Sequence, residues 1–274
     1  MARRGVSGYP SCPMREEETS PRRREAGVET DFGFRRVPET AKAPLVRGIF
    51  DSVAGRYDLM NDLMSGGIHR LWKAEMIAWL APRPGQRLVD VAGGTGDVAL
   101  RALPRLAPDA GGGAAVCDAN PSMVEIGRAR ALDRGIVAGI EWLCGDAEAL
   151  PFADRVFDLY TVAFGLRNVT HIARALAEAR RVLRPGGRFM ALEFAPAVGP
   201  LLQPLYDLYS FSVLPLLGQI VAGDRDAYRY LAESIRRFPP QSELAGMIAA
   251  AGLGRPRFRN LTGGIAVLYS AWRL

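Results

Sequence analysis

The sequence predicts an α/β fold in which seven strands form a doubly wound, mainly parallel sheet with helices on both faces. Short apolar stretches alternate with helical patterns, a glycine-rich turn follows the first of these stretches, and a final pair of strands closes the chain. Strands that alternate with helices are typical of a parallel sheet covered on both sides. Right-handed crossovers then leave a doubly wound sheet as the expected topology.

The elements are expected in a regular order. The strands are expected at residues 88–92, 114–117, 140–144, 157–163, 188–194, 255–260 and 265–273. Helices are expected at residues 45–80, after Gly96, from Pro121, and at residues 171–183, 226–237 and 241–251. Residues 185–187, Pro-Gly-Gly, predict a turn into the fifth strand. Residues 200–222 are apolar and predict an inserted helix, but prolines and Asp207 argue against a membrane span.

Composition divides the chain into a tail and one domain. Residues 1–40 are polar and rich in Pro, Gly and charge, so we expect a disordered tail, and a chain that starts near Val37 should remain active. Residues 41–274 are expected to form a single domain. The net charge of +6 comes without a basic stripe that carries interleaved aromatics, so no nucleic-acid partner is expected.

The cysteines indicate a reducing compartment. The three cysteines have no metal-ligand spacing, and Cys117 and Cys144 lie in expected strands, so we expect core thiols and assign no metal ligand. No apolar run follows the arginine-rich start, so no signal peptide is expected. These features favour a cytoplasmic protein.

A glycine-rich stretch joins the first expected strand, which contains Asp90, to the next helix. Gly93, Gly94 and Gly96 allow the backbone to turn sharply and to approach a ligand, and the following helix offers free N–H groups. Asp118 closes the second strand, where its carboxylate can accept hydrogen bonds from both ribose hydroxyls of an adenosine. The same residues also fit the dinucleotide fingerprint G-x-G-x-x-G/A, so a nicotinamide cofactor stays open at this point.

The region after the third strand favours a different cofactor. Asp146 and Ala147 follow that strand, and the Asp146 carboxylate can accept a hydrogen bond from an adenine amino group. A glycine loop, a ribose acid, an acid after the third strand and the sequence Arg-Pro-Gly-Gly before the fifth strand together resemble the Rossmann-like class I methyltransferases. That resemblance implies S-adenosylmethionine as the cofactor.

Two longer stretches resemble the signatures of the UbiE-type quinone methyltransferases. Residues Tyr57–Trp72 resemble the first signature and Arg181–Ala195 the second. The second departs at Arg184, where the family commonly has Lys, and at Ala195, where it commonly has Ser. Shorter matches lie at residues 164–169, 221–231, 233–238 and 260–264. The resemblance covers about residues 45–274 and is greatest to the alphaproteobacterial and mitochondrial branch.

The resemblance implies methyl transfer from S-adenosylmethionine to a ring carbon of a polyprenyl quinol. The acceptor would be 2-methoxy-6-polyprenyl-1,4-benzoquinol of ubiquinone biosynthesis, demethylmenaquinol of menaquinone biosynthesis, or both. Carried over to matching positions, the cofactor contacts are Thr95, Asp118, Asp146, Ala147 and Ala163. Other members have Ser where this chain has Ala163, so a contact there would be through the backbone or the methyl group.

The methyl acceptor needs a base or a charge that stabilises a phenolate, because deprotonation makes the ring more nucleophilic. Arg167 and Asn168 follow the fourth strand, at the edge where such sheets bind ligands. Arg167 is a candidate for stabilising the phenolate, and Asn168 for positioning the hydroxyl. His69 and Tyr57 lie in the first signature, which we expect to form a lid, and His69 is the natural base by its pKa. A purely structural role for His69 or for Arg167 remains open.

Two other functions are compatible with parts of the sequence. One is an NAD(P)-dependent oxidoreductase; the other is a non-catalytic methyltransferase-like subunit of a quinone-biosynthesis complex. The hydrophobic polyprenyl tail of the implied substrate predicts peripheral contact with the inner face of the membrane. Partner proteins and a homodimer are further possibilities, and the tail length of the substrate stays open.

Overall fold

The computed structural model describes residues 28–53, 61–63, 65–198, 203–213, 215–216, 219 and 225–274. The expected fold class is confirmed, since one sheet contains seven strands in the order β5-β4-β3-β6-β7-β9-β8. Neighbours are parallel except at β9, which runs antiparallel to both β7 and β8. Its strands are β3 (Arg87–Val91), β4 (Gly113–Asp118), β5 (Ile140–Cys144), β6 (Phe157–Ala163), β7 (Leu183–Phe194), β8 (Gly254–Leu261) and β9 (Ala266–Trp272).

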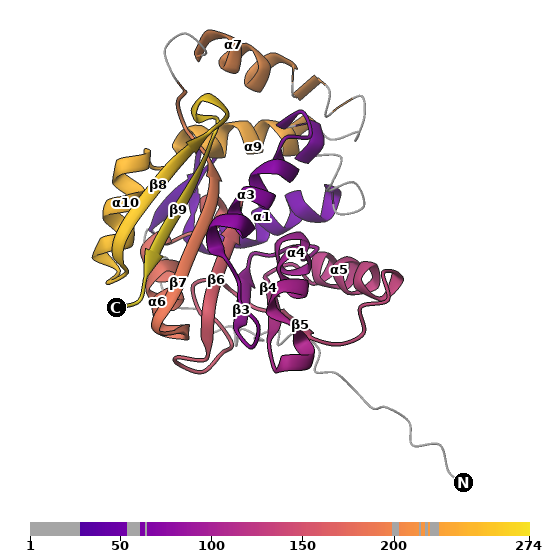
Figure 1. The fold of residues 1–274 in the computed structure, drawn as a ribbon. Coiled ribbons are helices and arrows are strands. Elements are labelled where there is room, and N and C mark those ends of the chain that lie inside the picture. The colour runs from indigo at the N-terminus through magenta and orange to yellow at the C-terminus, as the bar shows by residue number, and fades with distance from the viewer. Residues whose placement is uncertain are drawn as a thin grey trace, which may run out of the picture.

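Helices connect these strands and precede them. The α-helices are α1 (Glu39–Val53), α3 (His69–Leu80), α4 (Asp97–Leu106), α5 (Pro121–Asp133), α6 (Ile172–Val182), α7 (Gln203–Leu208), α9 (Arg225–Arg237) and α10 (Gln241–Ala250). Short 3-10 turns are η2 (Pro108–Ala110), η3 (Leu166–Asn168) and η5 (Thr262–Gly264), and a π-helical turn, η4 (Tyr209–Val213), continues α7. Figure 1 shows α1, α7 and α9 gathered beyond one end of the sheet.

Alternate residues of each central strand enter two separate cores, as the period of a strand requires. Leu88 of β3 packs with α3 and α4 on one face, whereas its neighbour Val89 packs with α6 and α10 on the other. Both side chains are fully buried. The sheet is therefore the middle layer of three, which explains why its central strands are apolar on both faces.

One expected turn lies inside a strand. Residues 185–187, the Pro-Gly-Gly predicted to precede the fifth strand, belong to β7, because its pairing with β6 jumps from Phe157↔Leu183 to Leu159↔Arg188. Gly186 has a φ of +80°, and a Cβ on Gly187 would lie 2.8 Å from the carbonyl oxygen of Arg184. The prediction of a tight bend was right, but the bend forms a bulge within the ladder.

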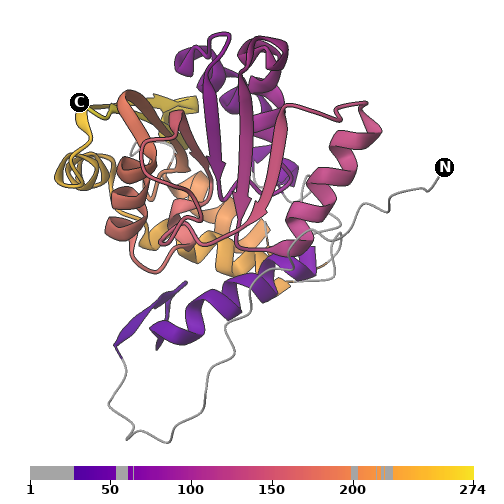
Figure 2. The ribbon, with the colours of Figure 1, turned by 90° about the horizontal axis from the view of Figure 1, so that it is seen from below.

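The prediction of a disordered tail over residues 1–40 was wrong for residues 29–40, which contain a β-hairpin and the start of α1. Within it, β1 (Glu29–Phe32) pairs antiparallel with β2 (Arg35–Pro38), and Gly33 has a φ of +60° in the turn. Phe32 and Val37 are buried in the same core as α9. Figure 2 shows this hairpin and α1 lying together along one side of the molecule. The polar composition of residues 1–40 gave no sign of the hairpin, because only two of its side chains, Phe32 and Val37, are buried in the core.

The apolar insertion is only partly described. Of residues 200–222, α7 and η4 are helical, and residues 215, 216 and 219 also have helical geometry. Asp207 forms an ion pair with Arg236 of α9, and the Tyr209 hydroxyl donates to the carbonyl of Leu63. Among the described residues, no helix is both long and apolar enough to cross a bilayer.

Candidate active site

The glycine loop between β3 and α4 has a backbone that other residues would not fit. Gly94 and Gly96 have φ values of +55° and +75°, a region that favours glycine. A Cβ on Gly93 would lie 2.8 Å from the carbonyl oxygen of Asp90, and one on Gly96 would lie 2.5 Å from the Trp142 ring. The loop is therefore pressed against β5, leaving its backbone at the carboxyl edge of the sheet.

Asp118, at the end of β4, accepts hydrogen bonds from this loop. Its Oδ2 accepts from the Gly94 N–H and its Oδ1 from the Asn120 N–H, both at 2.8 Å. Burial raises the pKa of the Asp118 carboxyl, and the two N–H donors oppose that rise. Each oxygen keeps a second lone pair. The carboxylate is thus held rigidly and can still accept two hydroxyl donors.

The end of β5 adjoins the end of β4. The Gly145 N–H donates to the Asp118 carbonyl at 3.0 Å. Asp146 is exposed, and its Oδ1 accepts from the Glu148 N–H at 2.9 Å, which folds the loop back. Ala147 is half-buried beside the core on the α6 face. The structure therefore brings the residues assigned to ribose and adenine to neighbouring strand ends.

Asp90 and Thr95 support the loop from behind. Asp90 is buried; its Oδ1 accepts from the Thr161 hydroxyl at 2.8 Å and its Oδ2 from the Ala99 N–H at 3.2 Å. Burial raises the pKa of Asp90 to about 7. The buried Thr95 hydroxyl accepts from Arg130 of α5 at 3.2 Å. In this arrangement both side chains bond to the protein itself, so their expected cofactor contacts remain predictions.

The end of β6 carries an unusual backbone. Phe164 has a φ of +60°, uncommon for a residue other than glycine, and its N–H donates to the Leu192 carbonyl at 2.7 Å. Ala92, at the end of β3, has a φ of +49°, and a Cβ on Gly165 would lie 2.4 Å from the Ala92 Cβ. Ala163 is half-buried just before this bend. Such outliers often cluster at functional sites, so both strand ends are candidates for ligand contact.

Arg167 lies in η3 and forms a buried ion pair. Its Nη1 donates to Glu193 Oε2 at 2.9 Å and to the Phe164 carbonyl at 2.7 Å, while its backbone N–H donates to Glu193 Oε1 at 3.3 Å. Burial raises the pKa of Glu193, and the neighbouring guanidinium opposes that rise. The Arg167 Nε is buried without a hydrogen-bond partner among the described residues. Arg167 therefore has the structural role that the sequence left open, and its buried Nε–H donor remains unused among the described residues.

Asn168 is held from two sides. Its Oδ1 accepts from the Tyr230 hydroxyl of α9 at 3.1 Å, and its Nδ2 donates to the Phe164 carbonyl at 3.4 Å. An aromatic cluster lies beside these residues: Phe164 and Phe194 have ring centroids 4.7 Å apart, and Trp72 of α3 meets Phe194 edge-on at 5.8 Å. The guanidinium therefore has an apolar wall next to it.

His69 begins α3 and is buried. Its Nε2 lies 2.9 Å from Asp62 Oδ1, and its Nδ1 has no hydrogen-bond partner among the described residues. Burial lowers the pKa of His69 more than Asp62 raises it. A neutral imidazole with one open nitrogen is what a base requires. One turn further along α3, Lys73 donates to Asp97 at the start of α4, at 3.0 Å. Tyr57 lies outside the described residues.

Sequence reasoning missed three supporting residues. Glu193 is a single acid within the apolar strand β7, and a buried acid demands a partner; this signal pointed to a pairing but did not identify Arg167. Tyr230 and Asn120 gave no such signal. Asn120 is the N-cap of α5, accepts from the Met123 N–H and donates to Asp51 of α1 at 2.8 Å. Both residues join elements that are far apart in the sequence.

Comparison with known proteins decides which family has this site. The model of the ubiE/COQ5 methyltransferase family matches residues 37–273. The chain belongs to the ubiE/COQ5 methyltransferase family. A protein of Paracoccus denitrificans is 61% identical over 246 residues, which cover 90% of this chain and 97% of that protein; it is named a ubiquinone/menaquinone biosynthesis C-methyltransferase UbiE. A protein with the same name from Cereibacter sphaeroides is 56% identical, over 91% of this chain and 99% of its own length. Another, from Brucella abortus, is 51% identical, over 90% of this chain and 92% of its own length.

Solved structures with lower identity share the fold. An S-adenosylmethionine-dependent methyltransferase from Aquifex aeolicus aligns with a TM-score of 0.57 at 15% identity, over 78% of this chain and 97% of its own. The [4+2]-cyclase SpnF aligns with a TM-score of 0.60 at 17% identity, over 83% of this chain and 94% of its own. Since these two names describe different reactions, the fold alone does not select the chemistry. Membership of the ubiE/COQ5 methyltransferase family identifies the chemistry as methyl transfer. It confirms the expected enzyme class and the dependence on S-adenosylmethionine.

Proposed function

We propose that this ubiE/COQ5 family member methylates a ring carbon of a polyprenyl quinol, with S-adenosylmethionine as the methyl donor. The acceptor is 2-methoxy-6-polyprenyl-1,4-benzoquinol, demethylmenaquinol or both, in line with the names of its relatives. The reduced ring is required, because an electron-poor quinone repels an electrophilic methyl group.

The carboxyl ends of β3, β4 and β5 would hold the cofactor. Asp118 would accept from the ribose hydroxyls, Asp146 from the adenine amino group, and the backbone at Gly93 and Gly94 would approach the rest of the molecule. The fit rests on the glycine loop, where a Cβ at Gly93 would clash, and on the free lone pairs of Asp118. When bound there, S-adenosylmethionine supplies an electrophilic methyl group. Thr95, Asp90 and Gly96 would keep the loop in shape, and Ala147 and Ala163 would border the adenine and the methyl group.

One observation carries the assignment of Arg167 as the charge that acts on the acceptor. Its buried Nε has no hydrogen-bond partner among the described residues, while Nη1 is fixed by Glu193 and Phe164. A guanidinium stays charged at all relevant pH values and needs no titration to stabilise a phenolate. Glu193 fixes its direction, and Asn168 would orient the acceptor hydroxyl. The rings of Phe164, Phe194 and Trp72 would exclude water from the reacting face.

His69 and Tyr57 are the alternative residues for proton removal. Burial keeps His69 neutral near pH 7, and Asp62 orients its ring. We further propose that α1 acts as a lid, supported by the hydrogen bond from Asn120 to Asp51 beside the strand edge.

The substrate tail implies contact with a membrane. Leu208, Phe211, Val213 and Leu216, all in or just after α7 and η4, are exposed. We propose that they rest against the cytoplasmic face of the membrane, where the polyprenyl tail resides. A quinone-biosynthesis complex or a homodimer could cover the same surface.

Two variants separate a catalytic role of Arg167 from a structural one. Arg167→Gln leaves Glu193 buried without a counter-charge and should cost about 3 kcal/mol of stability. Arg167→Gln/Glu193→Gln removes both charges and should recover much of that loss. If the guanidinium acts on the acceptor, both variants lose about 10²–10³ in turnover of the reduced quinol, with cofactor affinity nearly unchanged.

Turnover is measured by mass spectrometry with the benzoquinol and with demethylmenaquinol, each kept reduced. The control is Arg184→Gln/Asp158→Asn, which removes an ion pair of 3.1 Å between the amino-terminal ends of β6 and β7, away from the candidate site. This control variant should keep full activity. Wild-type turnover in the Arg167→Gln/Glu193→Gln protein would show that the pair is purely structural. Absence of a methylated product with either quinol in the wild-type enzyme would refute the proposed function.

A further inference from the structure

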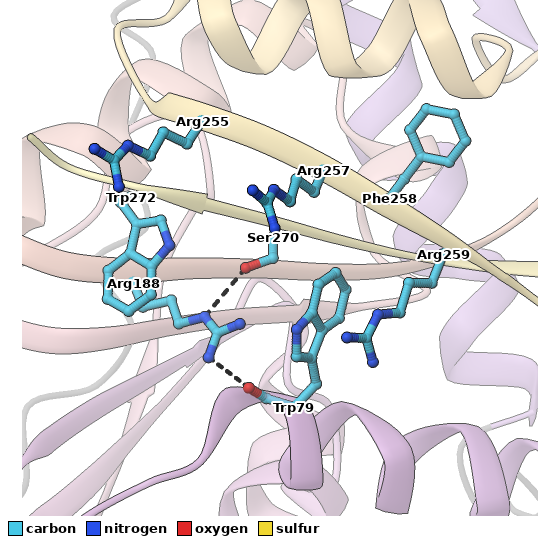
Figure 3. A pocket seen from close by; sticks show the side chains of 8 residues that line it. All are labelled: Trp79, Arg188, Arg255, Arg257, Phe258, Arg259, Ser270 and Trp272. Carbon is cyan, nitrogen blue, oxygen red and sulfur yellow. Dashed lines mark hydrogen bonds between the residues drawn. The ribbon is translucent and has the colours of Figure 1, made fainter.

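A second concave site lies far from the strand edge just described. Its cavity, of about 360 Å³, is bordered by Arg188, Arg255, Arg257, Arg259, Trp79 and Trp272, which together are called the arginine pocket below. Arg188 is at the amino-terminal half of β7 and pairs with Trp272 of β9. At about 3.3 Å per residue, Arg188 and Phe194 are roughly 20 Å apart along the strand. The arginine pocket, which Figure 3 shows from close by, is therefore separate from the candidate methyltransferase site.

The edge strand β8 supplies three of the four arginines. Its pairing with β9 jumps from Gly254↔Trp272 to Arg257↔Ser270, so β8 carries one extra residue there. Arg255 lies in this bulge with a φ of +53°, followed by Pro256, which cannot donate to a ladder. Bulges often redirect side chains. In Figure 3 the Arg257 side chain points toward Ser270, and Arg259 lies beside Trp79.

Arg188 is a half-buried cation that has no carboxylate partner within the described chain. Its Nε donates to the Ser270 hydroxyl at 3.1 Å, and its Nη1 donates to the carbonyls of Trp79 and Leu80. The guanidinium lies 4.9 Å from the Trp272 ring centroid and 5.6 Å from that of Trp79. Burial and the nearby Arg259 lower the pKa of Arg188. Neutral acceptors and rings orient this charge without neutralising it.

The remaining arginines add to the uncompensated charge. Arg259 stacks on Trp79 at 4.1 Å and has a single carboxylate, Glu75, at 3.6 Å in an exposed pair. For Arg255 and Arg257 the described residues offer no carboxylate within 4 Å. By contrast, Arg181 on the opposite face bonds to both Glu178 and Asp154. Three arginines without a carboxylate partner among the described residues thus border one cavity, which favours an anion of more than one charge.

We propose that the arginine pocket binds a phosphate or pyrophosphate group. Guanidinium forks match phosphate oxygens in pairs, and such charge-assisted bonds are stronger than neutral ones. The two indoles hold Arg188 and Arg259 in place, so little side-chain entropy remains to be lost on binding. The cavity volume falls within the range of about 300–1,000 Å³ that is usual for small-molecule sites. The group belongs either to a free phosphorylated metabolite or to an anionic lipid headgroup.

The test measures pyrophosphate binding by calorimetry with the full chain. The variant Arg255→Gln/Arg257→Gln removes two exposed side chains that make no hydrogen bond or ion pair within the described residues, so folding should be unaffected. Its matched control is Arg83→Gln/Arg134→Gln, which removes two exposed arginines from other surfaces. We expect saturable binding to the wild-type chain, at least about tenfold weaker binding to the pocket variant, and wild-type affinity in the control. Binding should weaken as salt rises.

Vesicles distinguish the two sources of the phosphate group. Vesicles of phosphatidylcholine with and without phosphatidic acid are mixed with the chain, and bound protein is measured by flotation. Binding that requires phosphatidic acid, is lost in the pocket variant and is competed by pyrophosphate supports the site and assigns it to a headgroup. Pyrophosphate binding without such vesicle binding supports the site and assigns it to a free metabolite. No saturable pyrophosphate binding, or equal loss in the control variant, overturns the proposal.

Discussion

Asp90 and Asp118 are both acids of the strand edge, yet their surroundings differ. Asp118 has backbone N–H donors on both oxygens and sits where β4 ends. Asp90 is enclosed beneath the glycine loop and bonds to Thr161 and to the first turn of α4. The first is suited to accept from a ligand, and the second to hold the loop. The sequence places both acids beside the loop, but their different partners come from elements that the sequence does not bring together.

The raised pKa of Asp90, about 7, predicts a specific pH dependence. Between its unfolded value near 4 and about 7, the folded chain binds the proton more tightly, so this group stabilises the fold at low pH and the effect is lost as pH rises through 7. Asp90→Asn mimics the neutral carboxyl and lacks this titration. As pH falls from 8 to 5, the unfolding free energy of the wild type should rise relative to Asp90→Asn by up to about 1.4 kcal/mol per pH unit.

Chemical denaturation of both proteins across this pH range checks the prediction. Because the same two proteins are compared at each pH, titration of His69 and of the surface acids cancels in the difference. A difference in unfolding free energy that is independent of pH would mean that Asp90 keeps the same charge throughout.

Among the elements, the hairpin β1–β2 connects the start of the described chain to the carboxyl edge of the sheet. Phe32 stacks on Tyr230 of α9 with ring centroids 4.4 Å apart, and Tyr230 in turn donates to Asn168. Glu233 of α9 accepts from the Phe34 N–H at 3.0 Å. From α1, Lys42 donates to the carbonyl of Val169 at 2.9 Å. The hairpin therefore supports the loop that contains Arg167 and Asn168.

Two truncated chains test this support. A chain that starts at Val28 keeps the hairpin and should match the full chain in stability and turnover. A chain that starts at Glu39 loses the buried Phe32 and Val37 and should lose about 3–6 kcal/mol of stability, since each large apolar side chain contributes about 1.5–3 kcal/mol on burial. Tyr230 would also be uncovered, so turnover should fall by more than cofactor affinity. Equal stability of the two truncated chains would show that the hairpin does not stabilise the rest of the fold.

The strands show which elements a single sequence predicts well. Residues 140–144 and 157–163 were predicted with the observed bounds of β5 and β6, because both are short, mostly apolar stretches rich in aromatic and β-branched residues and each lies between turn signals. The hairpin was missed because only Phe32 and Val37 mark it. The bulges in β7 and β8 were missed because register depends on the neighbouring strand. Local pattern therefore predicts the elements, and pairing across the sheet decides the details.

At the scale of the whole molecule, the same distinction applies to the two sites. Motifs located the glycine loop, Asp118, Asp146 and Arg167, because each lies at the carboxyl end of a strand or within a few residues after it. The arginine pocket has no such motif, since Arg188, Trp79 and the arginines of β8 come together only when β9 is inserted between β7 and β8. Contacts that depend on strand order are invisible until the topology is known.

Ligand binding at the carboxyl edge should stabilise the entire chain, because five strand ends, α1 and α3 all meet there. S-adenosylhomocysteine at 100 times its dissociation constant should add about 2.7 kcal/mol to the unfolding free energy, whereas NAD should add nothing measurable. Asp118→Ala should abolish the stabilisation by S-adenosylhomocysteine while the ligand-free protein stays folded, since among the described residues the carboxylate bonds to two backbone N–H groups and to no other group. Thermal unfolding of both proteins, with and without each ligand, measures these differences.

Asp146→Ala, at the neighbouring strand end, should reduce the stabilisation by S-adenosylhomocysteine less than Asp118→Ala does, because the Asp146 side chain is exposed and would make one of several contacts with the ligand. An undiminished shift in the Asp118→Ala protein would contradict the ribose assignment, and a shift with NAD would favour the dinucleotide interpretation of the glycine loop.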